Sequence, residues 1–463
     1  MGRKLSGRDF IKIGYPKNNT INIALGQLNR YKKKENKNSL LEEAKKVLLD
    51  PNSYIGDGIW GKIAESLINQ VEIKRHQLNN TRVPFSIYGE DAIDDQTKYQ
   101  LFTALKLPIA ISGALMPDAH YGYGLPIGGV LATDNAVIPY GVGVDIGCRM
   151  SLSVFNLPAN FLKGKDNQLL NILNDHTKFG MYDTHQNKVD HEIFYRDEFK
   201  NIPFVKKLLD KAYKQLGTSG GGNHFVEFGI VSLSETKPEW KLEPGEYIAV
   251  LSHSGSRGLG ANIAKHYTYL ATKQCPLPSN VQHLAWLDLA THDGQEYWMA
   301  MNLAGDYAKA CHDDIHRRIA KALGKQIAFT IENHHNFAWK EYLNGQEVIV
   351  HRKGATPASK GQLGIIPGSM TTNGFIVEGL GNEESLNSAS HGAGRLHSRN
   401  ACKNMFTKSE VKKTIKEADV QIIGGSIDEA PMAYKDINTV IQAQSDLIKI
   451  LGTFTPKFVR MDK

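Results

Sequence analysis

The chain has 463 residues, of which 41% are hydrophobic and 22% are charged, a composition typical of globular proteins that excludes a fibrous or largely disordered chain. Its formal charge of +7 is a modest basic excess, which is compatible with a nucleic-acid or nucleotide partner but is shared by many proteins that bind neither. No apolar run approaches the roughly 18 to 20 residues that span a bilayer, and the N-terminus lacks the apolar stretch of a secretion signal, so a cytoplasmic protein is predicted.

The first 80 residues have a helical pattern that differs from the rest of the chain. A polar run, YKKKENKNS, precedes the helical pattern of residues 39–49, and a second helix is predicted over residues 59–74. We expect residues 1–80 to form an extension of unknown role, followed by a catalytic domain over residues 81–463.

Residues 84–260 have the pattern of buried strands that lead into functional loops. Glycine-rich turns alternate with short apolar runs, at residues 127–133, 150–155 and 247–253. The pattern becomes helical between residues 261 and 324, and further strands are predicted at 326–332 and 346–354. This mixture predicts an α/β or mixed α+β fold in which helices flank central sheets.

The C-terminal part predicts two more helices. Thr407 and Glu410 have the spacing of a capping box, which predicts a helix over residues 409–418. Residues 436–452 have the pattern of an amphipathic helix.

Six short segments place a metal-binding or nucleophilic side chain among glycines or polar residues. Thiolate, carboxylate and imidazole groups bind divalent metals, and glycine allows backbone amides to approach an anion. The segments are VGVDIGC (Asp145, Cys148), GGGNHFVE (Asn223, His224, Glu227), HSGSRGLG (His253, Arg257), NHHN (His334, His335, Asn336), PGSM (Ser369) and SHGAGR (His391, Arg395). Together they predict a site for metal and phosphate.

Several of these segments follow predicted strands. His253 ends one strand, with Arg257 in the next loop, where a guanidinium can bind phosphate oxygens. NHHN follows another strand, and because adjacent side chains of an extended segment point to opposite faces, we expect only one of His334 and His335 to be a ligand. An imidazole before a small, flexible turn, as at His391, suits nucleophilic attack on phosphorus.

Other residues receive a structural interpretation. His312 and His316 have the i,i+4 spacing of a metalloprotease pair but lack its glutamate, so we assign them to a solvated helix face. No complete GxGxxG or GxxxxGK[ST] motif supports a Rossmann or Walker-type nucleotide site. The cysteines are widely spaced without a CxxC pair, which argues against a disulfide framework or a cysteine-rich zinc module, at positions Cys148, Cys275, Cys311 and Cys402.

Nine segments, taken together and in order, resemble the RtcB family of RNA ligases: MPDAHYGYGLPIGG, VGVDIGC, GGGNHFVEFG, HSGSRGLG, HHN, HRKGAT, IIPGSM, SHGAGR and EAPMAYKD. The resemblance runs from about residue 84 to the C-terminus and leaves out the first 80 or so residues. It implies an RtcB-like catalytic domain that uses GTP and two manganese ions. The implied reaction joins RNA 3'-phosphate or 2',3'-cyclic phosphate ends to 5'-hydroxyl ends.

The resemblance also implies roles for individual residues. His391 would form a histidine-GMP intermediate, and Arg257 and Lys353 would contact phosphate or RNA. One metal ion would be held by Asp145, Cys148 and His224, and the other by Cys148, His253 and His335. Guanosine would bind at Asn223, Phe225, Glu227, Asn336, Pro367, Gly368, Ser369, Met370, Gly392, Ala393, Gly394, Tyr434 and Lys463.

Two other functions remain compatible with the sequence. A two-metal phosphodiesterase or phosphatase would use the same ligands, with His391 as only a ligand or an acid. A non-catalytic RNA-binding module would explain the basic balance and the YKKKENK stretch but not the metal ligands. A thiolate with imidazoles favours zinc over manganese by intrinsic affinity, so manganese follows from the resemblance alone. The RNA partner, whether tRNA halves or damaged RNA, and the oligomeric state do not follow from the sequence.

Overall fold

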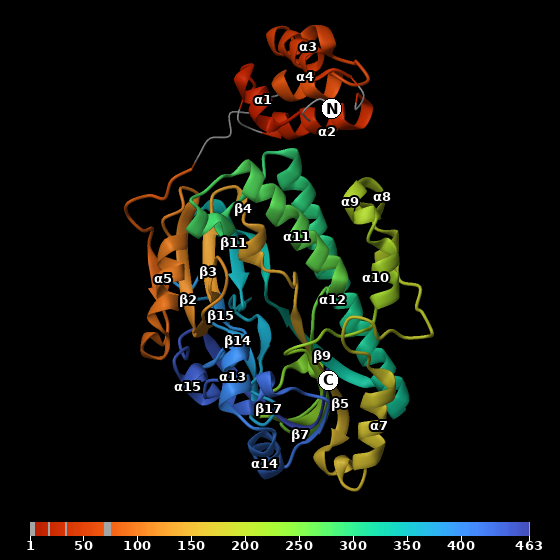
Figure 1. Cartoon of the computed structure of the whole chain (residues 1–463). Coiled ribbons are helices and arrows are strands. Elements are labelled where there is room, and N and C mark those ends of the chain that lie inside the picture. The colour runs from red at the N-terminus through yellow and green to blue at the C-terminus, as the bar shows by residue number, and fades with distance from the viewer. Residues whose placement is uncertain (1–4, 17–18, 33–34, 69–75, 463) are drawn as a thin grey trace. The chain divides into compact units, whose positions relative to one another are not determined.

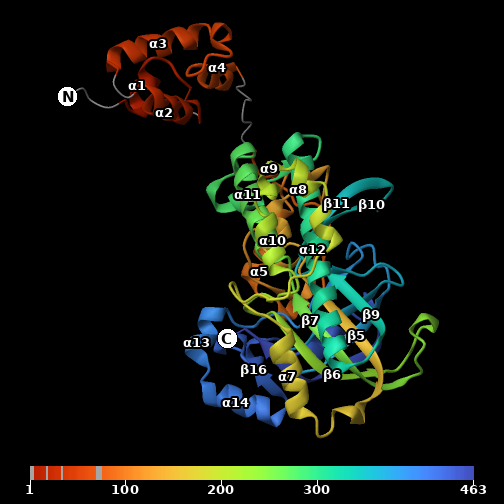
Figure 2. The same ribbon diagram turned by 90° about the vertical axis from the view of Figure 1, so that its right-hand side faces the viewer.

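The computed structural model describes residues 5–16, 19–32, 35–68 and 76–462, and the chain divides into two compact units, Met1–Lys74 and Arg75–Lys463. Figures 1 and 2 show the chain from two sides. Residues 1–74 hold 14 of the 55 Lys and Arg residues but only 8 of the 48 Asp and Glu residues. The first unit therefore carries +6 of the formal charge of +7, and the second unit is close to neutral.

The first unit is helical and has its own core. Its helices are α1 (Gly7–Lys12), α2 (Asn19–Tyr31), α3 (Lys37–Leu49) and α4 (Gly61–Ile68). Leu40, Ala44 and Val47 recur at helical spacing on α3 and pack into one buried cluster with residues of the other helices. The helix predicted over residues 39–49 is confirmed. The helix predicted over 59–74 is helical from Gly61 to Ile68, and its last residues lie outside the described ranges.

The second unit is built around two large β-sheets (Figure 1). The strands of the five-stranded sheet are, in spatial order, β1 (Phe85–Ile87), β2 (Ala110–His120), β3 (Ile127–Thr133), β11 (Gln346–Lys353) and β10 (Phe337–Leu343). The strands of the larger sheet are, in spatial order, β13 (Leu363–Ile366), β14 (Gly374–Gly379), β17 (Ile448–Met461), β6 (Phe225–Leu233), β7 (Gly245–Ser254), β5 (Arg149–Pro158) and β9 (Ile327–His334), with β16 (Gln421–Ile423) paired to β17. All five strands predicted from apolar runs are confirmed.

One side chain joins the two outer strands of the larger sheet. The Asn333 amide of β9 donates to the backbone carbonyl of Ile365 in β13 at 3.2 Å and accepts from the backbone amide of Ile365 at 2.8 Å. Asn333 is buried, so water does not compete for these bonds. The larger sheet therefore nearly closes on itself.

Two long helices account for the helical pattern between residues 261 and 324. They are α11 (Arg257–Gln274) and α12 (His292–Leu323), and Figure 2 shows α12 beside β5, β7 and β9. Shorter elements connect these parts of the unit: α5 (Asp95–Ala104), β4 (Ala136–Val137), α6 (Pro139–Val142), α7 (Asp166–His176), α8 (Glu198–Asn201), α9 (Pro203–Lys206), α10 (Leu209–Gln215), β8 (Leu287–Asp288), β12 (Ala355–Pro357), β15 (Ser388–Ser390) and α13 (Arg399–Met405). The predicted mixed fold, with helices around central sheets, is confirmed. Among the described residues, no helix is long and apolar enough to cross a membrane.

The prediction of a solvated face for His312 and His316 is wrong, because both rings are buried between α12 and the larger sheet. The carbonyl of Ser254 accepts from His312 Nε2 at 3.1 Å, so His312 Nδ1 accepts from the Ser252 hydroxyl at 2.6 Å. His316 Nε2 then donates to the oxygen of Ser252 at 2.7 Å. These bonds fasten α12 to the two residues of β7 that flank His253.

The C-terminal predictions have different outcomes. Thr407 and Glu410 form a capping box at the start of α14 (Lys408–Glu417), as predicted. The helix predicted over residues 436–452 is wrong beyond its first part, because α15 (Ile437–Gln442) ends early and the chain enters β17. Leu451 and Phe454 of β17 are buried in the core of the larger sheet, where pairing with β6 and β14 overrides the local helical pattern.

Candidate active site

A cavity of about 330 Å³ is lined at one side by residues from neighbouring strands of the larger sheet. Cys148 precedes β5, His224 precedes β6, His253 lies near the end of β7 and His335 follows β9. Phe225 pairs with His253 across β6 and β7, and the beginning of β5 pairs with the ends of both β7 and β9. This antiparallel register brings four distant segments to one edge of the sheet.

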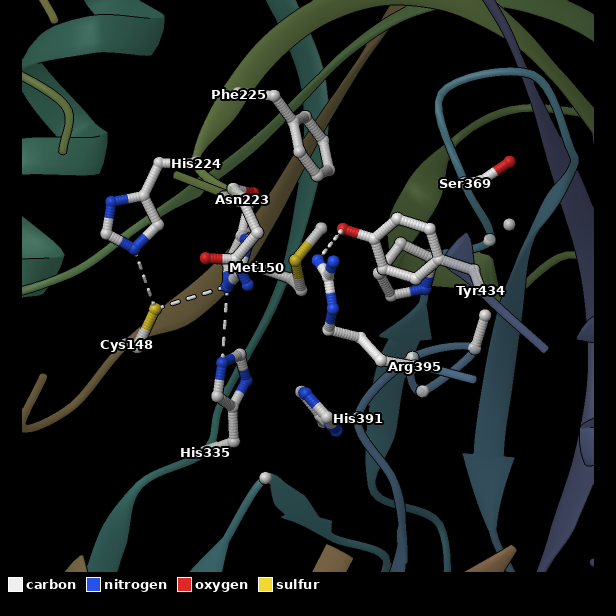
Figure 3. A pocket seen from close by; sticks show the side chains of 18 of the residues that line it. Cys148, Met150, Asn223, His224, Phe225, His335, Ser369, His391, Arg395 and Tyr434 are labelled. Carbon is white, nitrogen blue, oxygen red and sulfur yellow. Dashed lines mark hydrogen bonds between the residues drawn. The ribbon is translucent and has the colours of Figure 1, made fainter. Parts of the chain in front are cut away.

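The thiol of Cys148 lies among imidazole rings. Its Sγ is 3.4 Å from His224 Nε2 and 3.2 Å from His253 Nε2, and the ligand atoms of these three residues lie within 4.8 Å of one another. His335 Nε2 is 3.3 Å from His253 Nε2, and Asp145 Oδ2 is 2.9 Å from His224 Nε2. The five predicted metal ligands thus form one continuous group, much of which is visible in Figure 3.

The surroundings of this group fix its protonation. The carbonyl of Asn223 accepts from His253 Nδ1 at 2.9 Å, so the Nε2 lone pair of His253 faces the thiol. Desolvation lowers the pKa of His253 to about 3 and lowers the pKa of His335 well below its usual value, so both rings are neutral. Desolvation opposes ionisation of Asp145, but its hydrogen bond with His224 brings the pKa of this carboxyl below its usual value.

This donor set fits a divalent metal ion. Desolvation and the nearby Asp145 carboxylate raise the pKa of the Cys148 thiol well above its usual value, so the thiol is protonated in the free site. A divalent cation among these groups would displace that proton and take the thiolate, the imidazole nitrogens and the carboxylate as ligands. The thiolate and imidazoles suit zinc, whereas the carboxylate is the kind of ligand that manganese prefers.

The two adjacent histidines of NHHN point apart. The backbone amide of His335 donates to the carbonyl of Cys148 at 2.8 Å, and its ring lines the cavity. The ring of His334 lies on the other side, with its centroid 5.0 Å from the rings of Phe337 and Trp339. The expected alternation of the two side chains is therefore present.

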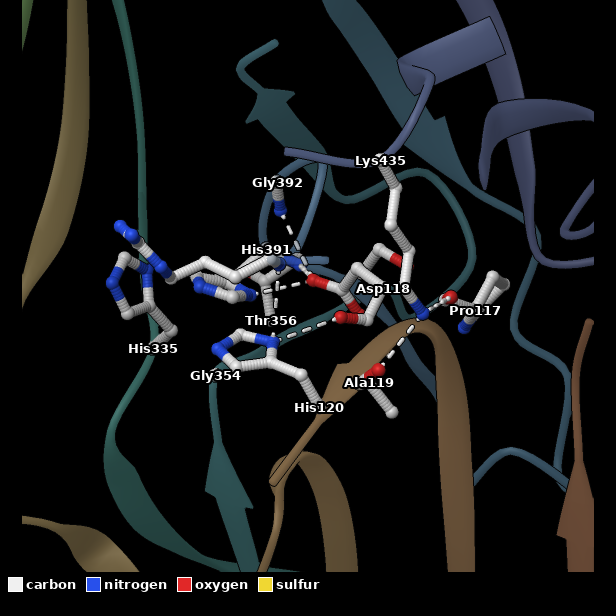
Figure 4. A network of polar contacts seen from close by, with 12 residues as sticks. Pro117, Asp118, Ala119, His120, His335, Gly354, Thr356, His391, Gly392 and Lys435 are labelled. Atoms are coloured by element: carbon white, nitrogen blue, oxygen red, sulfur yellow. Dashed lines mark hydrogen bonds and ion pairs between the residues drawn. The ribbon is translucent and has the colours of Figure 1, made fainter. Parts of the chain in front are cut away.

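Asp118, near the end of β2, holds the imidazole of His391. Its Oδ2 accepts from His391 Nδ1 at 2.6 Å and from the backbone amides of His391 at 3.1 Å and Gly392 at 3.3 Å (Figure 4). Because Nδ1 donates to Asp118, the lone pair of a neutral His391 ring is on Nε2. The ring lines the cavity with its centroid 4.9 Å from that of His335.

The surroundings of Asp118 were not identified from the sequence as functional. Lys435 Nζ donates to the carbonyls of Pro117 at 3.0 Å and Ala119 at 2.8 Å, which places a cation beside the buried carboxylate. His120 lines the cavity, and desolvation lowers its pKa to about 4, so this ring is neutral. The segments MPDAHYGYG and EAPMAYKD, which contain these residues, were the only sequence features that pointed to them.

The residues expected to bind guanosine line the same cavity. They are Asn223, Phe225, Glu227, Asn336, Pro367, Gly368, Ser369, Met370, Gly392, Ala393, Gly394 and Tyr434. Figure 3 shows Tyr434 and Ser369 at the opposite side of the cavity from Cys148 and His224. Desolvation raises the pKa of Glu227 well above its usual value, which favours its neutral, protonated form.

The buried carboxylate of Glu429, another residue that sequence reasoning missed, organises the Tyr434 side of the cavity. Its Oε2 accepts hydrogen bonds from Arg395 Nη1 at 2.8 Å and from the hydroxyl of Tyr434, and its Oε1 forms an ion pair with Arg399 Nη2 at 2.8 Å. Arg395, Arg399 and Tyr434 all line the cavity, so one carboxylate positions three of its polar side chains.

The three other predicted residues lie in different places. Lys353 lines the cavity, and desolvation lowers its pKa to about 7. Arg257 is not among the described residues that line the cavity, and its guanidinium donates to Thr218 Oγ1 at 3.1 Å and to the carbonyl of Gly180 at 2.5 Å. Lys463 lies outside the described residues.

Arg257 nevertheless lies close to the predicted metal ligand His224. A Cβ at Gly220 would collide with the ring of His224 and would lie 3.0 Å from Arg257 Nη1. The glycine of this loop therefore allows the imidazole and the guanidinium to share one side of the backbone.

Comparison with known proteins gives a consistent result. A family model described as tRNA-splicing ligase RtcB matches residues 100–461. The chain is 34% identical to the RNA-splicing ligase RtcB of Escherichia coli strain K12 over 394 residues, which cover 78% of this chain and 93% of the relative. It is 31% identical to the tRNA-splicing ligase RtcB of Nanoarchaeum equitans, with 81% and 94% covered, and 29% identical to the RNA-splicing ligase RtcB of Mycobacterium tuberculosis, with 77% and 98% covered. The chain belongs to the RtcB family.

Proposed function

We propose that the protein is a GTP- and manganese-dependent RNA ligase that joins 3'-phosphate or 2',3'-cyclic phosphate ends to 5'-hydroxyl ends through a histidine-GMP intermediate. Membership of the RtcB family supports the ligase activity, since the matching proteins are named RNA-splicing and tRNA-splicing ligases. The observation that best supports the chemistry is the position of His391, which is held by Asp118 and lies next to the thiol and imidazole group.

In the first step, His391 Nε2 attacks the α-phosphorus of GTP. An N–P bond forms while the P–O bond to pyrophosphate breaks, and pyrophosphate leaves with the electron pair of that bond. Asp118 accepts from Nδ1 throughout and stabilises the positive charge that develops on the ring. No base is needed to remove a proton from Nε2, because its lone pair is already free.

The five clustered side chains are the proposed metal ligands. Asp145, Cys148 and His224 would hold one manganese ion, and Cys148, His253 and His335 the other, with the thiolate shared. When bound, these ions supply positive charge that neutralises the phosphate oxygens of GTP. Gly392 and Gly394 line the cavity after the nucleophile, and a Cβ at Gly394 would collide with the carbonyl oxygen of Asp118, so glycine allows this turn to pack against the residue that holds His391.

In the later steps, an oxygen of the RNA 3'-phosphate attacks the phosphorus of the adduct. The N–P bond breaks, Nε2 regains its lone pair, and the RNA end carries GMP through a new P–O–P linkage. The 5'-hydroxyl of the second RNA then attacks the 3'-phosphorus, GMP leaves, and the hydroxyl proton passes to solvent. A 2',3'-cyclic phosphate is first opened by water. Arg395, and Lys353 in its protonated form, line the cavity and can neutralise the RNA phosphate.

A two-metal phosphodiesterase with His391 as general acid is a weaker candidate. A general acid must carry a proton on the nitrogen that faces the substrate. Asp118 engages the Nδ1 proton of His391, so Nε2 carries a lone pair in the neutral ring, whereas an acid would require the imidazolium form. A covalent guanylate on His391, which a phosphodiesterase does not form, distinguishes the two functions.

The test is incubation of the purified protein with manganese and GTP labelled at the α-phosphate, followed by denaturation and mapping of the retained label. We expect acid-labile label on His391 in the wild type and none in His391→Ala. His334→Ala, which changes a partly buried ring outside the cavity wall, serves as the matched control and should retain the label. Absence of label from the folded wild-type protein would contradict the proposed function.

A further inference from the structure

An aromatic cluster, formed by Tyr123, Tyr140 and His283, lies beside the cavity and has no part in the mechanism above. Tyr140 and His283 stack with centroids 4.9 Å apart. The ring of Tyr123 meets them edge to face, at 6.5 Å and 6.4 Å. Tyr123 is 66% exposed, and Tyr121 in the same loop is 57% exposed. Exposed rings that lie beside a cavity offer flat faces on which a nucleic-acid base can stack.

The loop that carries Tyr121 and Tyr123, between β2 and β3, is held in place. The backbone amide of Gly122 donates to Gln100 Oε1 at 3.0 Å, and Gln100 Nε2 donates to the carbonyl of Gly122 at 2.7 Å. Gly124 has a φ of +70°, and a Cβ there would lie 3.2 Å from the carbonyl oxygen of His283. The rings are thus presented on a preorganised backbone, which reduces the entropy lost on binding.

Lys353 connects the aromatic cluster to the cavity. Its Nζ donates to the carbonyls of Tyr123 at 2.5 Å and Tyr140 at 3.3 Å, and lies 5.1 Å from the centre of the Tyr140 ring. The same side chain lines the cavity. At the start of the loop, His120 also lines the cavity, two residues after the Asp118 that holds His391. Lys353 and the exposed tyrosine rings therefore lie beside the part of the cavity that contains His391.

We propose that Tyr123, supported by Tyr140 and His283, is the stacking seat for an RNA base beside the reacting end, with Lys353 contacting the neighbouring phosphate. This inference rests on the proposed ligase function and adds to it which part of the RNA the protein binds, namely a base near the reacting end. Stacking on a tyrosine accepts any base, because every base has a π-face. A base must leave its helix in order to stack, so the seat selects RNA with unpaired nucleotides at the end to be joined.

The first test compares Tyr123→Leu with two matched controls, Tyr123→Phe and Tyr342→Leu. The first control keeps the ring, and the second removes a 75% exposed tyrosine at the β10–β11 turn. We expect Tyr123→Leu to accept labelled guanylate at the wild-type rate while its KM for single-stranded RNA with a 3'-phosphate rises about tenfold, as for one lost stacked base. Both controls should keep the wild-type KM. An unchanged KM in Tyr123→Leu would overturn the proposal.

The second test detects stacking directly. RNA is made with 2-aminopurine at the terminal nucleotide of either end, because its fluorescence is quenched when it stacks. Binding to the wild type should quench the fluorescence at one end, and Tyr123→Leu should remove that quenching. Equal quenching by both proteins at both ends would refute the stacking seat. Failure of the wild type to accept guanylate would instead refute the ligase function, and the fluorescence measurement would still report on the seat.

Discussion

Asp118 and His391 are 273 residues apart in the chain, and a hydrogen bond of 2.6 Å joins Oδ2 of the carboxylate to Nδ1 of the imidazole. The same oxygen also accepts from the backbone amides of His391 and Gly392, so both the ring and the turn that follows it are fixed by one buried atom. The result is an imidazole with one defined orientation, in which Nδ1–H faces Asp118 and Nε2 is left for the cavity.

The carboxylate of Asp118 should be essential for adduct formation. Asp118→Asn removes the negative charge that stabilises the ring as it becomes positive, so we expect self-guanylylation to slow by about 10²- to 10⁴-fold. The label transferred from GTP measures the rate, and the manganese content of the purified variant checks that the metal group is intact. A near-normal rate in Asp118→Asn would show that the charge is not needed.

The two adjacent histidines should respond differently to substitution. His335→Ala removes an imidazole from the proposed metal group, and we expect manganese affinity to fall by at least about 100-fold. His334→Ala removes a ring that packs on Phe337 and Trp339, so it should lower the melting temperature but leave the manganese affinity close to that of the wild type. Titration calorimetry with manganese distinguishes them, and equal losses of affinity would contradict the assignment.

RNA binding should depend on the protonation of Lys353. Desolvation lowers its pKa from 10.5 to about 7, so its positive charge is present below pH 7 and is lost as the pH rises above it. We expect the affinity of the free enzyme for a 3'-phosphate RNA to fall between pH 6 and pH 8, about one unit on either side of this pKa. Lys353→Arg, which stays charged, should show a flatter profile in fluorescence anisotropy.

The lowered pKa of Lys353 also affects the stability of the fold, which should rise with pH where RNA affinity falls. Between pH 7 and pH 10.5 the unfolded chain binds a proton at Lys353 that the folded chain does not. This lysine therefore makes the free energy of unfolding rise with pH in that range. Lys353→Met should reduce that rise in urea titrations, and an unaltered slope would contradict the lowered pKa.

Loss of Glu429 should affect both folding and nucleotide binding. Glu429→Gln leaves Arg395 and Arg399 without a charged partner and weakens the bond to Tyr434, so we expect the free energy of unfolding to fall by about 3 kcal/mol. The KM for GTP should rise, because the displaced side chains line the proposed guanosine site. Urea denaturation and guanylylation kinetics measure the two effects, and a change in neither would contradict the organising role of this carboxylate.

The sequence predicted elements whose pattern is local. The predictions for residues 39–49 and 127–133 agree with α3 and β3. In each segment the spacing of the apolar residues alone indicates which side chains are buried. Residues 448–452 follow a helical pattern but form the start of β17, since pairing with β14 is a contact between distant segments. His312 and His316 were misplaced because i,i+4 spacing shows that two rings share a face but not whether that face meets solvent.

The residues of the candidate site likewise divide into those that a local pattern reveals and those that contacts between distant segments determine. Cys148, His224, His253 and His335 lie in short glycine- or polar-rich segments at strand ends, so their convergence could be predicted. Asp118 and Glu429 could not be found in this way, because a carboxylate acquires its role from partners that fold against it from other segments. Arg257 has a left-handed backbone with a φ of 54°, and its bonds to Thr218 and Gly180 could not be deduced from the loop sequence.

In the proposed mechanism, the hydrogen bonds to Asp118 that hold His391 also determine the order in which reactants can enter. In-line displacement places pyrophosphate opposite Nε2 as it departs, and the RNA phosphate must arrive at that same apical position to expel the imidazole. With the ring unable to swing to a second location, the two groups compete for one place. The kinetics should therefore be ping-pong, with pyrophosphate acting as a competitive inhibitor toward RNA and parallel lines in double-reciprocal plots of GTP against RNA.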